Sequence, residues 1–167
     1  MRSLVVVVLL AGSVHAQDPL MQAINSRYAA VKQNLLETAE VMPEKDYSFK
    51  LTPAQRNFGE WIEHTSGTLY NFCSAAKGQP APKSAPAEKK DAIVEKFKTA
   101  FEYCDATLKE MTDQKALTEM SVNGKPGYPV TALVSLIGGL NEHYGNLVGY
   151  MRSKGITPPS TARTQKK

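Results

Sequence analysis

A long apolar stripe at helical spacing, close to the C-terminal end, restricts the possible folds more than any other part of the sequence. Its members recur every three or four residues and therefore share one face of an α-helix: Leu133, Leu136, Ile137, Leu140, Tyr144, Leu147, Val148 and Met151. His143 lies on the same face. A helix with such a face packs against other elements, and an imidazole on its buried side needs a structural or chemical reason.

Three further segments carry the same kind of pattern, and no segment has convincing strand character. The sequence therefore predicts an all-α four-helix bundle. The helices are expected at about residues 18–41, 57–77, 87–111 and 129–155. Asp18 followed by Pro19 is a start signal for the first helix, and Pro129 opens the fourth. Gly78 is a stop signal after the second helix, and residues 123–129 are expected to form a turn.

The first sixteen residues are expected to be a secretory signal that is removed. Arg2 supplies the positive end, and the apolar run over residues 4–10 is too short to cross a bilayer. Ala16 is the small residue that a signal peptidase prefers. Ser13 stands where a lipoprotein needs its cysteine, so no membrane anchor is expected. These features predict a periplasmic or secreted protein whose domain spans residues 17–155.

The distribution of charge gives no indication of a nucleic-acid partner. Of the 20 lysine and arginine residues, Arg2 lies in the expected signal and five lie beyond Met151. That leaves 14 basic residues against all 16 acidic ones in the remainder, which is not the continuous basic face that phosphate backbones require. Residues 156–167 are expected to be a disordered basic tail.

The mature chain contains two cysteines, Cys73 and Cys104. In an oxidising compartment they can form a disulfide, but two buried free thiols fit the sequence as well. If the second and third helices ran antiparallel, the two residues would lie at different heights and could not meet. If these helices run parallel, the proline-rich residues 78–86 have to span the bundle, and about ten extended residues reach roughly 30 Å. A disulfide between the two cysteines would therefore predict that the second and third helices run parallel.

Two histidines remain in the mature chain, His64 and His143. His64 lies one turn after Trp61, near the apolar edge of the second helix. Two inward imidazoles on different helices could share a divalent metal ion in the bundle. Two histidines that are hydrogen-bonded to their neighbours at the edge of the core would give the same spacing, so both interpretations stay open.

Several short motifs, taken in order, resemble those of the DinB-like (DinB/YfiT) superfamily. The motifs are residues 47–53 (YSFKLTP), 58–64 (FGEWIEH) and 143–147 (HYGNL). Residues 72–78 (FCSAAKG) and 103–105 (YCD) are similar to a secreted subgroup of that family. The likeness covers about residues 20–159. It implies an up-down-down-up four-helix bundle with a long crossover between helices two and three, which agrees with a Cys73–Cys104 disulfide.

The resemblance also implies a metal site of three histidines, one on the second helix and two that lie four residues apart on the fourth. His64 corresponds to the first of these ligands and His143 to the last. The remaining position is Gly139, which has no side chain that could bind a metal. Two imidazoles alone hold zinc or nickel weakly, because a catalytic site normally has three protein ligands and an exchangeable water.

Three functions compete on this basis. The first is a metal-dependent hydrolase or thiol-transferase-like enzyme that uses His64 and His143. The second is a non-catalytic protein that binds a small ligand, or a metal weakly, beside Gly139. The third is a structural module that forms a homodimer, an arrangement common in the family. The missing ligand favours the second function, and so does export, because the small thiols that those transferases use are cytosolic. No catalytic residue is assigned.

Overall fold

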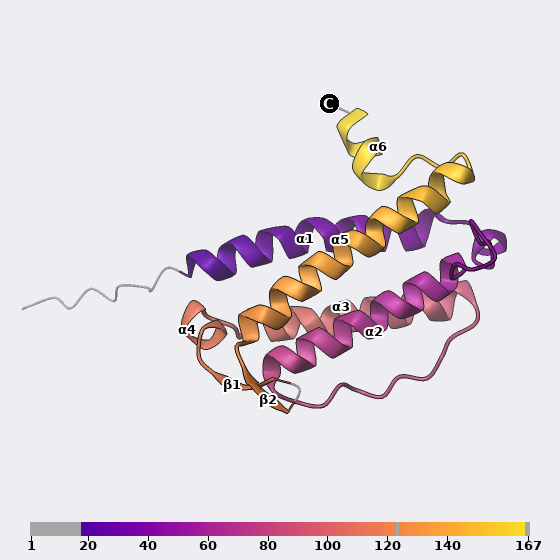
Figure 1. Cartoon of the computed structure of the whole chain (residues 1–167). Helices are drawn as coiled ribbons and strands as arrows, with labels where there is room; N and C mark the ends of the chain where they lie inside the picture. The colour runs from indigo at the N-terminus through magenta and orange to yellow at the C-terminus, as the bar shows by residue number, and fades with distance from the viewer. Residues whose placement is uncertain (1–17, 123, 166–167) are drawn as a thin grey trace, which may run out of the picture.

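The computed structural model describes residues 18–122 and 124–165, so the expected signal peptide over residues 1–16 lies outside the described part. The described chain is mostly helical and has six α-helices (Figure 1). The four long helices are α1 (Pro19–Val41), α2 (Phe58–Lys77), α3 (Lys90–Lys109) and α5 (Pro129–Ser153). The short elements are a 3₁₀ turn η1 (Glu44–Asp46), α4 (Asp113–Ala116), β1 (Met120–Val122), β2 (Lys125–Gly127) and α6 (Pro159–Gln165).

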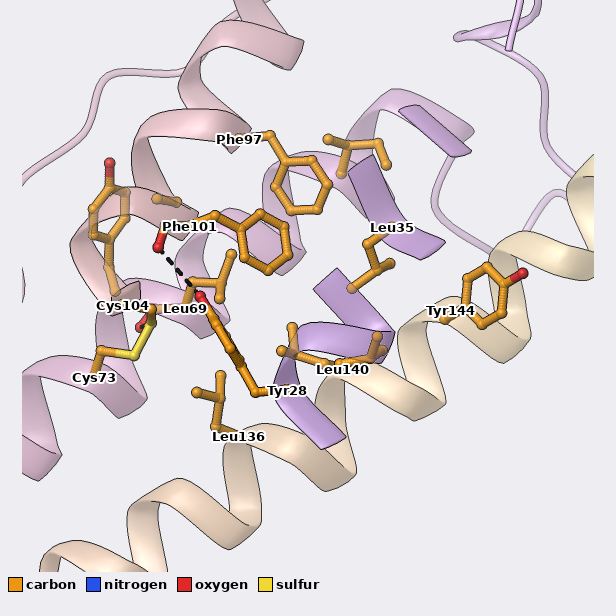
Figure 2. Close-up of a cluster of buried hydrophobic side chains, with 14 of the residues drawn as sticks. Tyr28, Leu35, Leu69, Cys73, Phe97, Phe101, Cys104, Leu136, Leu140 and Tyr144 are labelled. Atoms are coloured by element: carbon orange, nitrogen blue, oxygen red, sulfur yellow. Dashed lines mark hydrogen bonds between the residues drawn. A yellow bond between two sulfur atoms is a disulfide. The ribbon is translucent and has the colours of Figure 1, made fainter. Parts of the chain in front are cut away.

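The core lies between the four long helices, each of which turns its apolar face inward as the helical spacing predicts. Helix α2 packs against both α3 and α5, while α1 packs against α5 and α3. Figure 2 shows aromatic and aliphatic side chains from all four helices meeting in the centre. The labelled members include Leu35, Leu69, Phe97, Phe101, Leu136 and Leu140, all nearly inaccessible to water. Burial of such side chains supplies most of the driving force for the fold.

Helix α2 has well-defined ends, which fixes the register of the residues that it carries. At its start, the Asn57 side chain accepts a hydrogen bond from the Glu60 backbone N–H, and the Glu60 carboxylate accepts one from the Asn57 N–H. This reciprocal pair is a capping box. At its end, Gly78 adopts a left-handed conformation with φ of 65°, which closes the helix at Lys77 as predicted.

The start of α1 is stabilised differently from the prediction. Asp18 lies at the N-cap position as expected, but its side chain does not cap its own helix. Instead, Asp113 accepts hydrogen bonds from the backbone N–H groups of Leu20 (3.0 Å) and Met21 (2.8 Å). The Asp18 carboxylate in turn accepts one from the Asp113 N–H at 2.8 Å. The two aspartates therefore cap each other's helices and join α1 to α4.

A disulfide joins Cys73 near the end of α2 to Cys104 near the end of α3, with the two Cα atoms 5.5 Å apart (Figure 2). The prediction of this bond is confirmed. The extended segment between Lys77 and Lys90 runs along the bundle to the start of α3 (Figure 1). The Lys96 ammonium holds this segment in place, because it donates to the Ala85 carbonyl at 2.8 Å and also pairs with the carboxylate of Glu63.

The expectation that the chain contains no strand is wrong. Strands β1 and β2 form an antiparallel hairpin in which Met120 lies opposite Gly127 and Val122 opposite Lys125. The hairpin occupies the region expected to be a plain turn. Gly124 has φ of 77°, a conformation that suits the turn between two strands. Strands of three residues are too short to produce the alternating pattern that identifies a strand in a sequence.

The prediction of a disordered tail is wrong for residues 159–165, which form α6. The Tyr144 hydroxyl on α5 donates to the Ser160 Oγ at 2.7 Å, and Pro159 is buried. The Arg163 guanidinium binds both the Glu37 carboxylate and the Asn34 side-chain oxygen on α1. The two contacts of Arg163 connect residues more than a hundred positions apart, so local composition gave no indication of them.

Candidate two-histidine site

Helices α2 and α5 bring His64 and His143 side by side, with 4.8 Å between the centres of the two rings. The His143 side chain faces the core and is only 6% exposed, whereas His64 lies at the exposed edge of α2. The geometry follows from the two helix patterns, because His143 follows Leu140 by three residues on the buried face of α5. The structure therefore places together the two residues that the sequence singled out.

The indole of Trp61 is the side chain around which the two imidazoles pack. Its ring centre lies 5.8 Å from that of His64 and 5.5 Å from that of His143. The indole N–H donates to the Tyr150 hydroxyl oxygen at 3.2 Å, and the Tyr150 hydroxyl donates to the Arg56 carbonyl. These bonds fix the indole between α2 and α5, and the indole limits how far either imidazole can move.

Thr65 provides the direct polar contact to His143. Its Oγ1 lies 3.2 Å from the His143 Nδ1 and also donates to the backbone carbonyl of Trp61 at 2.7 Å. The Thr65 side chain is fully buried. Sequence reasoning missed this residue. The only signal available was a hydroxyl one turn after Trp61 on the same helix face. Its contact with His143 can be recognised only once the packing of α5 against α2 is known.

The surroundings keep both imidazoles neutral near pH 7. The pKa of His143 is lowered from 6.5 to about 4, mainly by burial and then by the neighbouring His64, while the Glu142 carboxylate opposes the shift. Burial also lowers the pKa of His64, and the positive charge of Arg56 adds to this effect. The Arg56 guanidinium lies over the Trp61 indole, 5.2 Å from its centre. Arg56 was likewise missed by sequence reasoning.

Gly139, the position at which the sequence resemblance implies a third ligand, has room for a side chain next to α2. A Cβ atom built on Gly139 would lie 3.7 Å from the Thr68 Cγ2 on α2, which is an ordinary van der Waals contact. Thr68 is one turn beyond His64 on the same helix. Gly139 also lies one turn before His143 on α5, so a side chain there would project from the same side of the helix as His143. Glycine supplies no ligand there.

Among the described residues, no further side chain joins the two histidines to form a three-ligand metal site. Within residues 18–122 and 124–165, no group of three His, Cys, Asp or Glu side chains is placed to hold a metal ion. The Glu63 carboxylate pairs with Lys96, and the Asn141 amide donates to the Ile137 carbonyl at 2.8 Å. The donor set consists of two neutral imidazoles. It does not fit a three-histidine centre, and it fits a two-ligand site of low affinity.

A comparison with models of protein families identifies one family, and solved structures share its fold. The family model described as "DinB superfamily" matches residues 27–148. A DinB-like protein from Bacillus cereus is 18% identical with a TM-score of 0.71, and the match covers 83% of this chain and 95% of that one. A DinB-like protein from Bacillus subtilis is 22% identical with a TM-score of 0.67, over 81% and 93% of the two chains.

A third solved structure, a conserved protein from Enterococcus faecalis, is 14% identical with a TM-score of 0.64, over 80% and 95% of the chains. At these identities the structures show a shared fold and nothing further. No curated protein matches the sequence. None of the helices in the described residues combines the length and the apolar composition that crossing a membrane requires.

Proposed function

The chain belongs to the DinB superfamily, and from this we propose that it is an exported, non-catalytic member that binds a divalent metal ion or a small ligand weakly through His64 and His143. One observation carries the proposal. Two neutral imidazoles from α2 and α5 face each other, and Gly139 stands where a third ligand would be needed. The metal expected there is zinc or nickel, because imidazole nitrogen suits both.

Two features of the site support weak binding in particular. A zinc ion with two protein ligands lacks the coordination on which both structural and catalytic sites depend. The Arg56 guanidinium also places a positive charge close to both imidazoles, as the lowered pKa of His64 reflects. That charge disfavours a metal cation in the same way that it disfavours a proton. We therefore expect an affinity well below that of a three-histidine centre.

The proposed export and topology are supported by the disulfide. Disulfides persist in oxidising compartments and are rare in the cytosol. Cys73 and Cys104 lie near the C-terminal ends of α2 and α3, so their bond favours parallel helices. An up-down-down-up order of the four long helices, with residues 78–89 as the crossover, accommodates this bond. We propose this order for the bundle.

Zinc titration of the full mature protein tests the function. Calorimetry should detect weak zinc binding in the parent protein and none in His143→Ala. His64→Ala removes the other imidazole, from the exposed edge of α2, and should abolish zinc binding equally. Zinc binding that is tight in the parent, or that survives in His143→Ala, would contradict a weak site built on the two histidines.

A further inference from the structure

The position of the single Thr65 hydroxyl proton determines which ring nitrogen of His143 carries a proton. The Thr65 Oγ1 lies 2.7 Å from the Trp61 carbonyl oxygen and 3.2 Å from the His143 Nδ1. A carbonyl oxygen can only accept a hydrogen bond. Two oxygens at 2.7 Å therefore need a proton between them, and the hydroxyl is the group that carries one. Its proton is thus committed to Trp61.

With that proton committed, Oγ1 can only accept from His143. The contact at 3.2 Å then requires a proton on Nδ1 of the imidazole. Thr65 is fully buried and His143 is 6% exposed, so water is not positioned to replace either partner. A neutral imidazole carries one proton, which leaves Nε2 as an unprotonated acceptor. No hydrogen-bond partner for Nε2 lies among the described residues.

We propose that Thr65 is a positioning residue that holds His143 as the tautomer protonated on Nδ1, so that Nε2 is presented to the ligand. The ligand class follows from this. An unprotonated Nε2 binds a Lewis-acidic cation or a proton donor and does not bind an acceptor-only anion. When a histidine binds a metal through one nitrogen, a hydrogen bond that its other ring N–H donates generally orients the ring and raises its basicity. This consequence for ligand choice rests on the proposed function, whereas the tautomer itself does not.

The tautomer can be read directly by long-range nitrogen–proton correlation spectra of ¹⁵N-histidine-labelled, metal-free protein at neutral pH. The parent protein should show His143 protonated on Nδ1. Thr65→Val, which keeps the shape of the side chain, should lose that signature in favour of the Nε2-protonated tautomer. Thr65→Ser restores the hydroxyl and should restore the parental spectrum.

Thr68→Val is the matched control. The Thr68 hydroxyl makes the same kind of bond one turn further along α2, to the His64 carbonyl at 3.1 Å, and it has no hydrogen bond to His143. Its loss should leave the His143 tautomer unchanged. A parent protein with the proton on Nε2, or a Thr65→Val variant that keeps the parental tautomer, would overturn the proposal. Because these spectra are recorded without metal, a failure of zinc binding would not alter their outcome.

Discussion

His143 illustrates how a titratable side chain is accommodated in a helical core. Its ring is buried against Trp61, and its one polar contact within the described residues is to Thr65. Burial penalises the charged imidazolium, so the folded protein holds the neutral ring. A neutral imidazole keeps a lone pair available for a ligand at a modest cost to the core.

The lowered pKa of His143 predicts a loss of stability in acid. The pKa is about 4 in the folded state and near 6.5 when unfolded, so below pH 6.5 the unfolded chain binds the proton more readily. Stability should therefore fall as the pH drops from 7 to 4, by roughly 3 kcal/mol from this residue alone. Urea unfolding of metal-free protein at several pH values measures the effect.

His143→Gln supplies the comparison for that experiment, because it removes the titrating ring while leaving the carboxylates and His64 in place. The parent should lose about 3 kcal/mol more than the variant between pH 7 and pH 4. Equal losses in the two proteins would show that His143 is not held neutral by the fold.

The two histidines could be predicted from the sequence, and the residues that control them could not. His64 and His143 lie on recognisable helix faces and match family motifs. The role of Thr65 depends on the register of α5 against α2, which local spacing does not determine. The role of Arg56 depends on the loop before α2 bringing the guanidinium over Trp61.

Among the elements, α1 and α4 depend on each other through their caps. The Asp113 carboxylate accepts from two backbone N–H groups at the start of α1, and it also belongs to the first turn of α4. A carboxylate at a helix N-terminus also interacts favourably with the helix dipole. The start of α1 is therefore stabilised by a residue that is more than ninety positions away in the sequence.

Asp113→Ala should destabilise the protein by about 1–2 kcal/mol, since it removes an N-cap and leaves two N–H groups unpaired. Chemical denaturation measures the change. Thr112→Ala is the control, because the Thr112 hydroxyl accepts only from the Lys115 N–H of the one-turn helix α4. The control should cost clearly less than Asp113→Ala. Equal effects of the two substitutions would contradict the role of Asp113 in capping α1.

The disulfide between α2 and α3 gives a second prediction at this scale. Thiol titration of unfolded, unreduced protein should detect no free thiol, because Cys73 and Cys104 are bonded to each other. Two reactive thiols would contradict this result. Replacing both cysteines by serine should lower the free energy of unfolding by roughly 3–4 kcal/mol, as the chain-entropy model gives for a 31-residue separation.

The long helices could be predicted from the sequence because each carries apolar residues at a regular period, and α1, α2 and α5 are followed closely by Pro43, Gly78 and Gly155. The hairpin over residues 120–127 could not, since three-residue strands show no period. Helix α6 was missed because it is stabilised by side chains of other helices, Glu37 on α1 and Tyr144 on α5.

At the scale of the whole molecule, we propose that the bundle retains two ligands of a three-histidine site whose third position is Gly139. Helices α2 and α5 still bring two imidazoles within 4.8 Å of each other, and the position of the third ligand is open. The hydrophobic core and the disulfide also hold these helices together.

Restoring the missing ligand tests this account most directly. Gly139→His should increase zinc affinity by about tenfold or more over the parent, because a third imidazole completes the donor set. Gly138→His is the matched control. A Cβ atom at position 138 meets nothing within 4 Å. The variant gains the same helix propensity as Gly139→His, but its new side chain points about 100° away from the direction of position 139.

Zinc titration of these two variants, and of Gly139→His combined with His143→Ala, is the decisive measurement. The account predicts a gain in Gly139→His alone, little change in Gly138→His, and loss of the gain when His143 is removed. If Gly139→His binds zinc no more tightly than Gly138→His, the two histidines are not the remainder of a metal site.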